Sequence, residues 1–179
     1  MTTTPTTGLL AALSSDADET MSWVTHAARD TVAGVDYVTI TVVADDRSLS
    51  SVGSTDPLAL SADSLQYSLR QGPTMAVLRG ELLVRSSDLR ADLRWADYGS
   101  HLQPLGIRAQ TALALRWSDQ TVGALNLYST GPETLTVDAL ALARQYAAQA
   151  AKAWETISSA RREAMSPQRQ GLMPPALVS

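Results

Sequence analysis

The chain has 179 residues, 45% of them hydrophobic and 18% charged, which is typical of one globular domain and excludes a wholly disordered chain. It contains no cysteine, so disulfides, thiolate metal sites and cysteine nucleophiles are excluded. The formal net charge of −4 argues against nucleic-acid binding by the chain as a whole. Neither a membrane span nor a secretion signal is recognisable, and we expect a cytoplasmic protein.

The two ends of the chain carry no hydrophobic periodicity. Residues 1–11 begin with a threonine-rich stretch, and residues 165–179 contain three prolines and one glycine. Such compositions are typical of loose terminal segments or of arms that order on a partner. We therefore predict disorder over 1–11 and 165–179, and one folded domain over 12–164.

The first half of the domain predicts a helix, a hairpin and two shorter helices. Apolar residues recur at helical spacing over 15–33, after an acidic stretch suited to a helix N-terminus. β-Branched residues alternate with others over 36–44, which predicts a strand, and 48–53 can return beside it. Helices are expected over 60–70 and 74–79, separated by a Gln-Gly-Pro stop.

The second half predicts three more strands and a long helix. A short buried strand is expected over 82–84, and residues 87–106 then form a polar and aromatic segment with one or two irregular helical turns. The clearest hairpin joins 108–117 to 121–128. An alanine-rich helix follows over 137–164, long enough to project beyond a domain of this size.

A seam of apolar residues runs along this last helix at heptad spacing. It includes the candidate dimer-interface residues Leu140, Ala147, Trp154 and Ile157. The small alanines would let two helices approach closely, and a twofold axis could complete a four-helix bundle with the first helix. A stripe packed inside one chain would give the same pattern, so both interpretations stay open.

The order of elements and several short motifs resemble GAF domains, and most closely those of actinobacterial GAF–ANTAR regulators. The resemblance covers about residues 12–160. It is carried by Gln71-Gly72-Pro73, Leu78-Arg79-Gly80-Glu81, Val84, Asp88-Leu89, Trp95, Leu105-Gly106-Ile107 and Val122-Gly123-Ala124-Leu125-Asn126-Leu127-Tyr128.

The resemblance implies an α+β fold, with an antiparallel sheet of five or six strands and the long N- and C-terminal helices packed on one face. It also implies a regulatory sensor that binds a small molecule between the sheet and residues 60–106. The signal would pass through dimerising terminal helices to a signalling or transcription partner. The alternative is a degenerate GAF domain that acts as a ligand-free dimerisation or protein-interaction module.

The chain departs from the resembled regulators at defined places. Thr74 follows Pro73 where those regulators often carry a cysteine, and only about 15 residues follow residue 164, too few for an RNA-binding ANTAR bundle. The lack of cysteine excludes the thiol-dependent bilin receptors and methionine sulfoxide reductases of GAF type. The phenylalanine-containing pattern of the phosphodiesterase GAF domains is missing, so cyclic-nucleotide binding is not expected.

Seven polar or aromatic residues are the candidate ligand-binding side chains. Two come from one strand face, two from one helix face at a spacing of four, and three from the irregular segment where the resemblance places the pocket wall. Aromatic rings could stack on a planar ligand, and a histidine could hydrogen-bond it. The alternative for each is packing or a surface position, and Asn126 is interpreted as structural. The seven are Thr39, Thr41, Tyr67, Gln71, Trp95, Tyr98 and His101.

No catalytic motif is recognisable in the sequence, which lacks a nucleophile elbow, a P-loop and a His-Glu-x-x-His pattern. Its two histidines are too few for a three-histidine metal site. We therefore expect neither catalytic nor metal-binding residues, with a thiol-free enzyme as a third alternative. The expected partners are a small molecule, a second copy of the chain and a regulatory protein, and neither a membrane nor a nucleic acid. No motif in the sequence indicates a cofactor.

Overall fold

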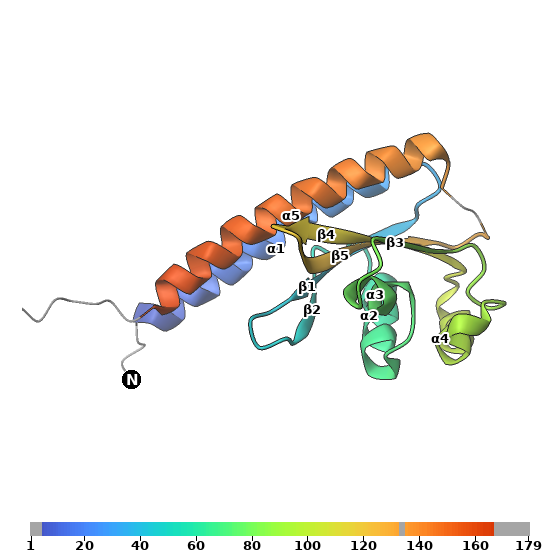
Figure 1. Ribbon diagram of the computed structural model, residues 1–179, viewed down its shortest axis with the longest axis horizontal. Coiled ribbons are helices and arrows are strands. Elements are labelled where there is room, and N and C mark those ends of the chain that lie inside the picture. Colours follow the sequence, from blue (N-terminus) through green and yellow to red (C-terminus); the bar gives the residue numbers. More distant parts are fainter. Residues whose placement is uncertain (1–4, 133–134, 167–179) are drawn as a thin grey trace, which may run out of the picture.

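A five-stranded antiparallel sheet with helices on both faces forms the molecule, as a computed structural model of residues 5–132 and 135–166 shows (Figure 1). The strand order is β2-β1-β5-β4-β3, in agreement with the predicted α+β fold. The strands are β1 (Tyr37–Val43), β2 (Leu49–Val52), β3 (Leu83–Ser86), β4 (Ala109–Trp117) and β5 (Gln120–Ser129).

The long helices α1 (Pro5–Thr31) and α5 (Val137–Met165) lie side by side along one face of the sheet and run past its edge at one end (Figure 1). Helix α1 begins ten residues before its predicted start, and therefore includes residues 5–11, where the composition predicts disorder. The physical reason is that proline suits a first helical turn and that the Leu-Leu-Ala-Ala-Leu run has high helix propensity. Of the predicted C-terminal disorder, residues 167–179 lie outside the described residues.

An apolar core fills the space between this helix pair and the sheet. Val38, Ile40 and Val42 of β1 face it, because successive strand residues point to opposite faces. From α1, Met21 and Val24 are buried in the same core. Each such side chain contributes about 1.5–3 kcal/mol to folding through burial.

The predicted seam of α5 packs into this core. Ala147 and Trp154 are only 4% and 6% exposed, and Leu140 and Ile157 are partly buried against them. Within one chain, therefore, the seam is the core stripe that the sequence left open as an alternative. Its small residues let α1 and α5 approach closely, and the Thr31 and Tyr146 hydroxyls hydrogen-bond across the pair at 2.8 Å. A homodimer, and the residues at its interface, stay predictions.

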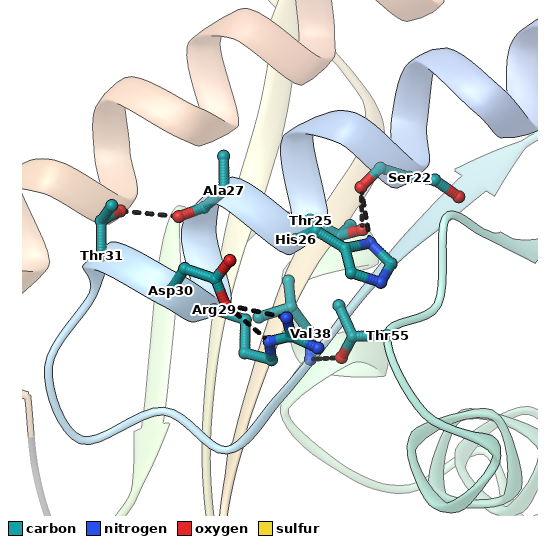
Figure 2. A network of polar contacts seen from close by, with 9 residues as sticks. All are labelled: Ser22, Thr25, His26, Ala27, Arg29, Asp30, Thr31, Val38 and Thr55. Atoms are coloured by element: carbon teal, nitrogen blue, oxygen red, sulfur yellow. Dashed lines mark hydrogen bonds and ion pairs between the residues drawn. The ribbon is translucent and has the colours of Figure 1, made fainter.

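Helix α1 is also fastened to the sheet by polar contacts. Gly53, just after β2, lies against the α1 backbone with a φ of +58°, where an added Cβ would meet the Met21 carbonyl carbon at 2.5 Å. Its amide donates to Asp18 at 2.9 Å, and its carbonyl accepts from the Thr25 hydroxyl. On the same helix, the His26 ring faces the Ser22 carbonyl (Figure 2), and its Nδ1 lies 2.8 Å from that oxygen. None of the helices described is long and apolar enough to cross a membrane.

Shorter helices cover the other face of the sheet. They are α2 (Pro57–Leu69), α3 (Pro73–Leu78) and α4 (Ala96–Leu102), with single 3-10 turns at Leu93–Trp95 and Gln103–Leu105. Helix α2 starts three residues before its predicted start, because Asp56 caps it by accepting from the Leu58 amide at 2.7 Å and proline takes the first turn. Helix α4 lies within the segment 87–106, for which one or two helical turns are predicted.

Candidate functional site

The face of the sheet beneath α2, α3 and α4 carries polar side chains that are removed from solvent. Thr39 and Thr41 point there from β1, opposite the apolar residues that face α1 and α5. Gln110 on β4 and Asn126 and Tyr128 on β5 join them, because strand pairing sets Thr39 beside Asn126 and Gln110 beside Tyr128. All five are at most 1% exposed.

Asp63 of α2 is the charged centre of this region and is fully buried. One carboxylate oxygen accepts from the Ser51 hydroxyl at 2.6 Å. The other accepts from the Tyr128 hydroxyl and from the Asn126 amide, the latter at 3.3 Å. Three elements, β2, β5 and α2, therefore meet at one carboxylate.

Burial raises the pKa of Asp63 to about 6, because a carboxylate loses its hydration there, and the hydrogen bonds from Ser51 and Tyr128 oppose the rise. Burial, and then the negative charge of Asp63, raise the pKa of Tyr67 beyond its ordinary value. Within the described ranges, no arginine, lysine or histidine forms an ion pair with Asp63.

A continuous set of hydrogen bonds extends from Asp63 across the covered face. Asn126 donates to the Thr39 and Thr41 hydroxyls at 3.0 and 2.9 Å, and its oxygen accepts from Thr74 at 2.8 Å. Gln110 donates to the Thr74 hydroxyl at 3.0 Å and accepts from the Tyr98 hydroxyl at 2.9 Å.

Helix α2 adds two more side chains to this set. Gln66 donates to the Tyr128 hydroxyl at 3.0 Å and accepts from the Thr74 amide at 2.9 Å. The Tyr67 hydroxyl lies 2.7 Å from that of Thr41 and 2.8 Å from that of Ser51. We call the whole set the interior polar cluster: Thr39, Thr41, Ser51, Asp63, Gln66, Tyr67, Thr74, Tyr98, Gln110, Asn126 and Tyr128.

Four of the seven predicted ligand-binding residues come together in this cluster. They are Thr39 and Thr41 from β1, Tyr67 from α2 and Tyr98 from α4. The structure thus joins strand and helix positions that lie far apart in the sequence. Whether they bind a ligand stays a prediction.

The other three predicted residues lie outside the cluster. Gln71 donates to the Asp97 carboxylate at 2.9 Å and accepts from the Tyr98 amide at 3.3 Å. Trp95 is buried among apolar side chains, with the Arg94 guanidinium 4.2 Å from its ring centre. His101 is exposed, and its Nδ1 lies 2.7 Å from the Asp97 carbonyl oxygen.

Sequence reasoning did not select the other seven members of the cluster, which are Ser51, Asp63, Gln66, Thr74, Gln110, Asn126 and Tyr128. Asp63, Gln66 and Tyr67 are spaced three and four apart, which places them on one face of α2 beside the buried Ala59 and Ala62. That pattern of polar residues on the apolar face of a helix was an available signal. The polar positions Asn126 and Tyr128, two apart on β5, were another.

The cavities at the surface lie away from the cluster. One of them, of about 580 Å³, lies between the turns of the two hairpins and the C-terminal part of α5, and Trp117, Trp154 and Arg162 line it. Another, of about 460 Å³, lies between α2 and α4 and is lined by leucines, serines and His101. The described residues contain no group of three or more histidine or acidic side chains placed to hold a metal ion.

Comparisons with known proteins agree with this architecture. A family model described as GAF domain matches residues 14–155, whereas none of the curated proteins compared matches the chain. All three of the similar solved structures named next are under 25% identical, so their likeness supports the fold alone.

The first of these structures is a domain of a protein from Sinorhizobium meliloti 1021 assigned to the two-component sensor histidine kinases. It is 12% identical with a TM-score of 0.65, and the match covers 83% of this chain and 96% of that one. The third GAF domain of Slr1393 from Synechocystis, in its photoproduct state, is 17% identical with a TM-score of 0.62, covering 82% and 98%. A GAF domain/HD domain protein from Geobacter sulfurreducens is 17% identical with a TM-score of 0.60, covering 86% and 98%. The sheet order, the two helical layers and the match over residues 14–155 lead to one conclusion, that this chain belongs to the GAF domain family.

Proposed function

We propose that this chain is a regulatory sensor domain that binds a small molecule at the interior polar cluster and transmits binding through α1 and α5 to a signalling or transcription partner. The observation that supports this most is the buried cluster around Asp63. Apolar side chains of similar volume would stabilise the interior as well or better than a buried carboxylate does. Buried ionisable groups with shifted pKa values are instead enriched at functional sites.

The strands provide a physical route from the cluster to the long helices. Thr39 and Thr41 of β1 belong to the cluster, whereas Val38 and Ile40 of the same strand pack in the core beneath α1 and α5. A ligand that separates the threonines from Asn126 changes the position of β1. Because packed cores have few alternative arrangements, such a shift moves the helix pair as a unit.

The second candidate is a GAF domain that binds no ligand and acts only in dimerisation or protein interaction. It is favoured by the completeness of the cluster, whose polar side chains bond to one another. Among the buried side-chain atoms described, the one without a hydrogen-bond partner is Arg161 Nε, which belongs to α5 and not to the cluster. If this alternative holds, the side chains of the cluster fill the space between the sheet and the short helices, and their role is structural.

We also propose that the chain has no catalytic role and acts in the cytoplasm. Both histidines have their Nδ1 against main-chain carbonyls, His26 at Ser22 and His101 at Asp97. The Ser100 hydroxyl also lies 3.4 Å from His101 Nδ1, but both residues are exposed on α4, whereas a catalytic base and its nucleophile are held together in a site. From the sequence resemblance, we also propose that the chain is related to the actinobacterial GAF–ANTAR regulators.

A matched pair of tyrosine variants tests the proposed sensor function. Tyr128→Phe removes a hydroxyl from the cluster, and Tyr146→Phe removes one from the α1–α5 pair. Small-molecule fractions of a cell extract are added to each protein, and the melting temperature is measured by calorimetry. We expect one fraction to stabilise the wild type and Tyr146→Phe, and to stabilise Tyr128→Phe less. Equal stabilisation of all three proteins, or none by any fraction, would favour the ligand-free alternative.

A further inference from the structure

The cavity of about 580 Å³ between the two hairpin turns and the C-terminal part of α5 is open space of the size that small-molecule sites have. Both turns lie at the end of the sheet from which the two long helices project (Figure 1). A second hollow, of about 310 Å³, adjoins the cavity and shares Val43, Trp154 and Ser158 with it. None of the residues of the interior polar cluster lines either space.

Two indole rings belong to the walls of the cavity. Trp117 ends β4 and is 39% exposed, whereas Trp154 packs in the core below α5 and is only 6% exposed. Val122, two residues into the next strand, lines the cavity beside them. Flat aromatic surfaces of this kind favour a planar aromatic ligand that packs on them.

Arg161 of α5 brings a positive charge without a carboxylate partner to the adjoining hollow. It lines that hollow, and its guanidinium carbon lies 5.4 Å from the centre of the Trp154 ring. Its Nε is buried and has no hydrogen-bond partner, and among the described residues no acidic side chain forms an ion pair with it. A buried donor without an acceptor costs free energy, which an oxygen of a ligand would recover. The planar fork of a guanidinium matches a carboxylate in particular.

The other charged groups at the cavity limit the charge of the ligand. Arg162 donates to Glu155 at 2.9 Å and lies 4.0 Å from Asp45, so its charge is already paired. Arg47, in the β1–β2 turn, lines the cavity and is exposed. The two carboxylates repel a doubly charged group such as a phosphate more strongly than a singly charged one. The site therefore favours a single negative charge, placed beside Arg161.

We propose that this cavity binds a planar aromatic carboxylate, whose ring packs on the Trp117 and Trp154 indoles and whose carboxylate accepts hydrogen bonds from Arg161. Such a ligand contacts both hairpin turns and α5 at once, so it holds the C-terminal part of that helix against the sheet. The site is separate from the interior polar cluster, and the inference does not depend on the sensor function proposed above.

Three probes that differ in one property at a time test the ligand class. Naphthoate is a planar aromatic carboxylate, naphthamide is its neutral counterpart, and decalin carboxylate keeps the charge without the aromatic ring. Each is titrated into the whole chain, and the dissociation constant is taken from the NMR shift of the Trp117 indole N–H, which Trp117→Phe assigns. We expect naphthoate to bind at least about tenfold more tightly than naphthamide, because only naphthoate forms charge-assisted hydrogen bonds. It should bind about fivefold more tightly than decalin carboxylate, because only the aromatic ring stacks.

A matched pair of arginine variants connects the binding to Arg161. Arg161→Gln should weaken naphthoate binding about tenfold, to the level of naphthamide, and leave the affinity for naphthamide unchanged. Arg144→Gln, at an exposed position of the same helix outside the cavity, should change neither affinity. Should Arg161→Gln fold poorly, the three probes on the wild type still decide the matter.

Two further controls locate the binding. The indole N–H of Trp23, an exposed residue of α1 outside the cavity, should not shift in the same spectra. Tyr128→Phe should bind naphthoate as the wild type does, because its hydroxyl belongs to the interior polar cluster.

The inference is overturned if naphthamide or decalin carboxylate binds as tightly as naphthoate, or if no probe shifts the Trp117 signal. It is also overturned if the Trp23 signal shifts as much as that of Trp117, or if Arg161→Gln and Arg144→Gln weaken naphthoate binding equally. None of these outcomes bears on the interior polar cluster, which the tyrosine variants test separately.

Discussion

At the scale of single residues, the burial of Asp63 makes the fold less stable as the pH rises. Its pKa is about 6 in the folded chain and near the ordinary value of 3.8 in the unfolded one, so folding takes up a proton between these values. The stabilisation is fully present below pH 3.8 and is lost as the pH rises through 6. A difference of about two pH units corresponds to about 3 kcal/mol.

Comparing the wild type with Asp63→Asn isolates this contribution. We expect the wild-type free energy of unfolding, minus that of the variant, to fall by about 3 kcal/mol from pH 3.5 to pH 7. Urea denaturation at each pH measures it, and the effects of other carboxylates cancel in the difference. A difference that does not change with pH would show that Asp63 is ionised in the folded protein at acidic pH.

The candidate site was only partly predictable at this scale. Thr39 and Thr41 could be assigned to one strand face because alternation is a local property. The burial of Asp63 in the cluster could not be predicted, because it depends on how α2 lies over β1 and on the pairing of Thr39 with Asn126. His101 failed to reach the cluster because its position on α4 points to solvent, and helix phase in an irregular segment has no strong sequence signal.

At the scale of elements, α4 packs so closely on the preceding loop that Gly99 admits no side chain. A Cβ at Gly99 would lie 2.0 Å from the Leu89 carbonyl oxygen, which is fixed main chain. Helix α4 also carries Tyr98, whose hydroxyl bonds Gln110 in the cluster. The position of this short helix is therefore set by one glycine.

We expect Gly99→Ala to destabilise the fold by about 1–3 kcal/mol through overpacking, although alanine is the better helix former. Ser100→Ala, at the exposed neighbouring position, is the matched control and should change stability little. Chemical denaturation of the three proteins measures both effects. Unchanged stability in Gly99→Ala would mean that α4 can move away from the loop without cost.

Most elements could be predicted because their signals are local. The alternation in β1, β4 and β5 and the Gln-Gly-Pro stop after α2 fixed the order of strands and helices along the chain. The start of α1 and the role of the α5 seam could not be predicted from such local signals. Helix propensity at residues 5–11 competes with a threonine-rich start, and an apolar stripe has the same spacing whether it faces its own core or a second chain.

At the scale of the whole molecule, we propose that an exposed tryptophan belongs to the surface on which a second copy packs. Trp23 of α1 is 69% exposed, while the predicted seam residues of α5 face the core of their own chain. Aromatic residues that become buried in an interface contribute strongly to association. We therefore place the proposed homodimer contact on the outer side of α1.

Sedimentation equilibrium tests this placement. We expect the wild type to be dimeric and Trp23→Glu to raise the dimer dissociation constant at least about tenfold. Trp117→Glu is the control, because that tryptophan is also exposed but lies at the end of β4. A monomeric wild type, or equal effects of the two substitutions, would contradict the assignment.

Native mass spectrometry of the purified chain, before and after exposure to a cell extract, tests most directly whether the interior polar cluster is a ligand site. The wild type and Tyr146→Phe are predicted to retain a non-protein mass that Tyr128→Phe loses, and the same spectra report the number of subunits. A wild type that stays free of added mass under both conditions, or a mass that Tyr128→Phe retains equally well, would contradict the account and leave the chain as a ligand-free interaction module.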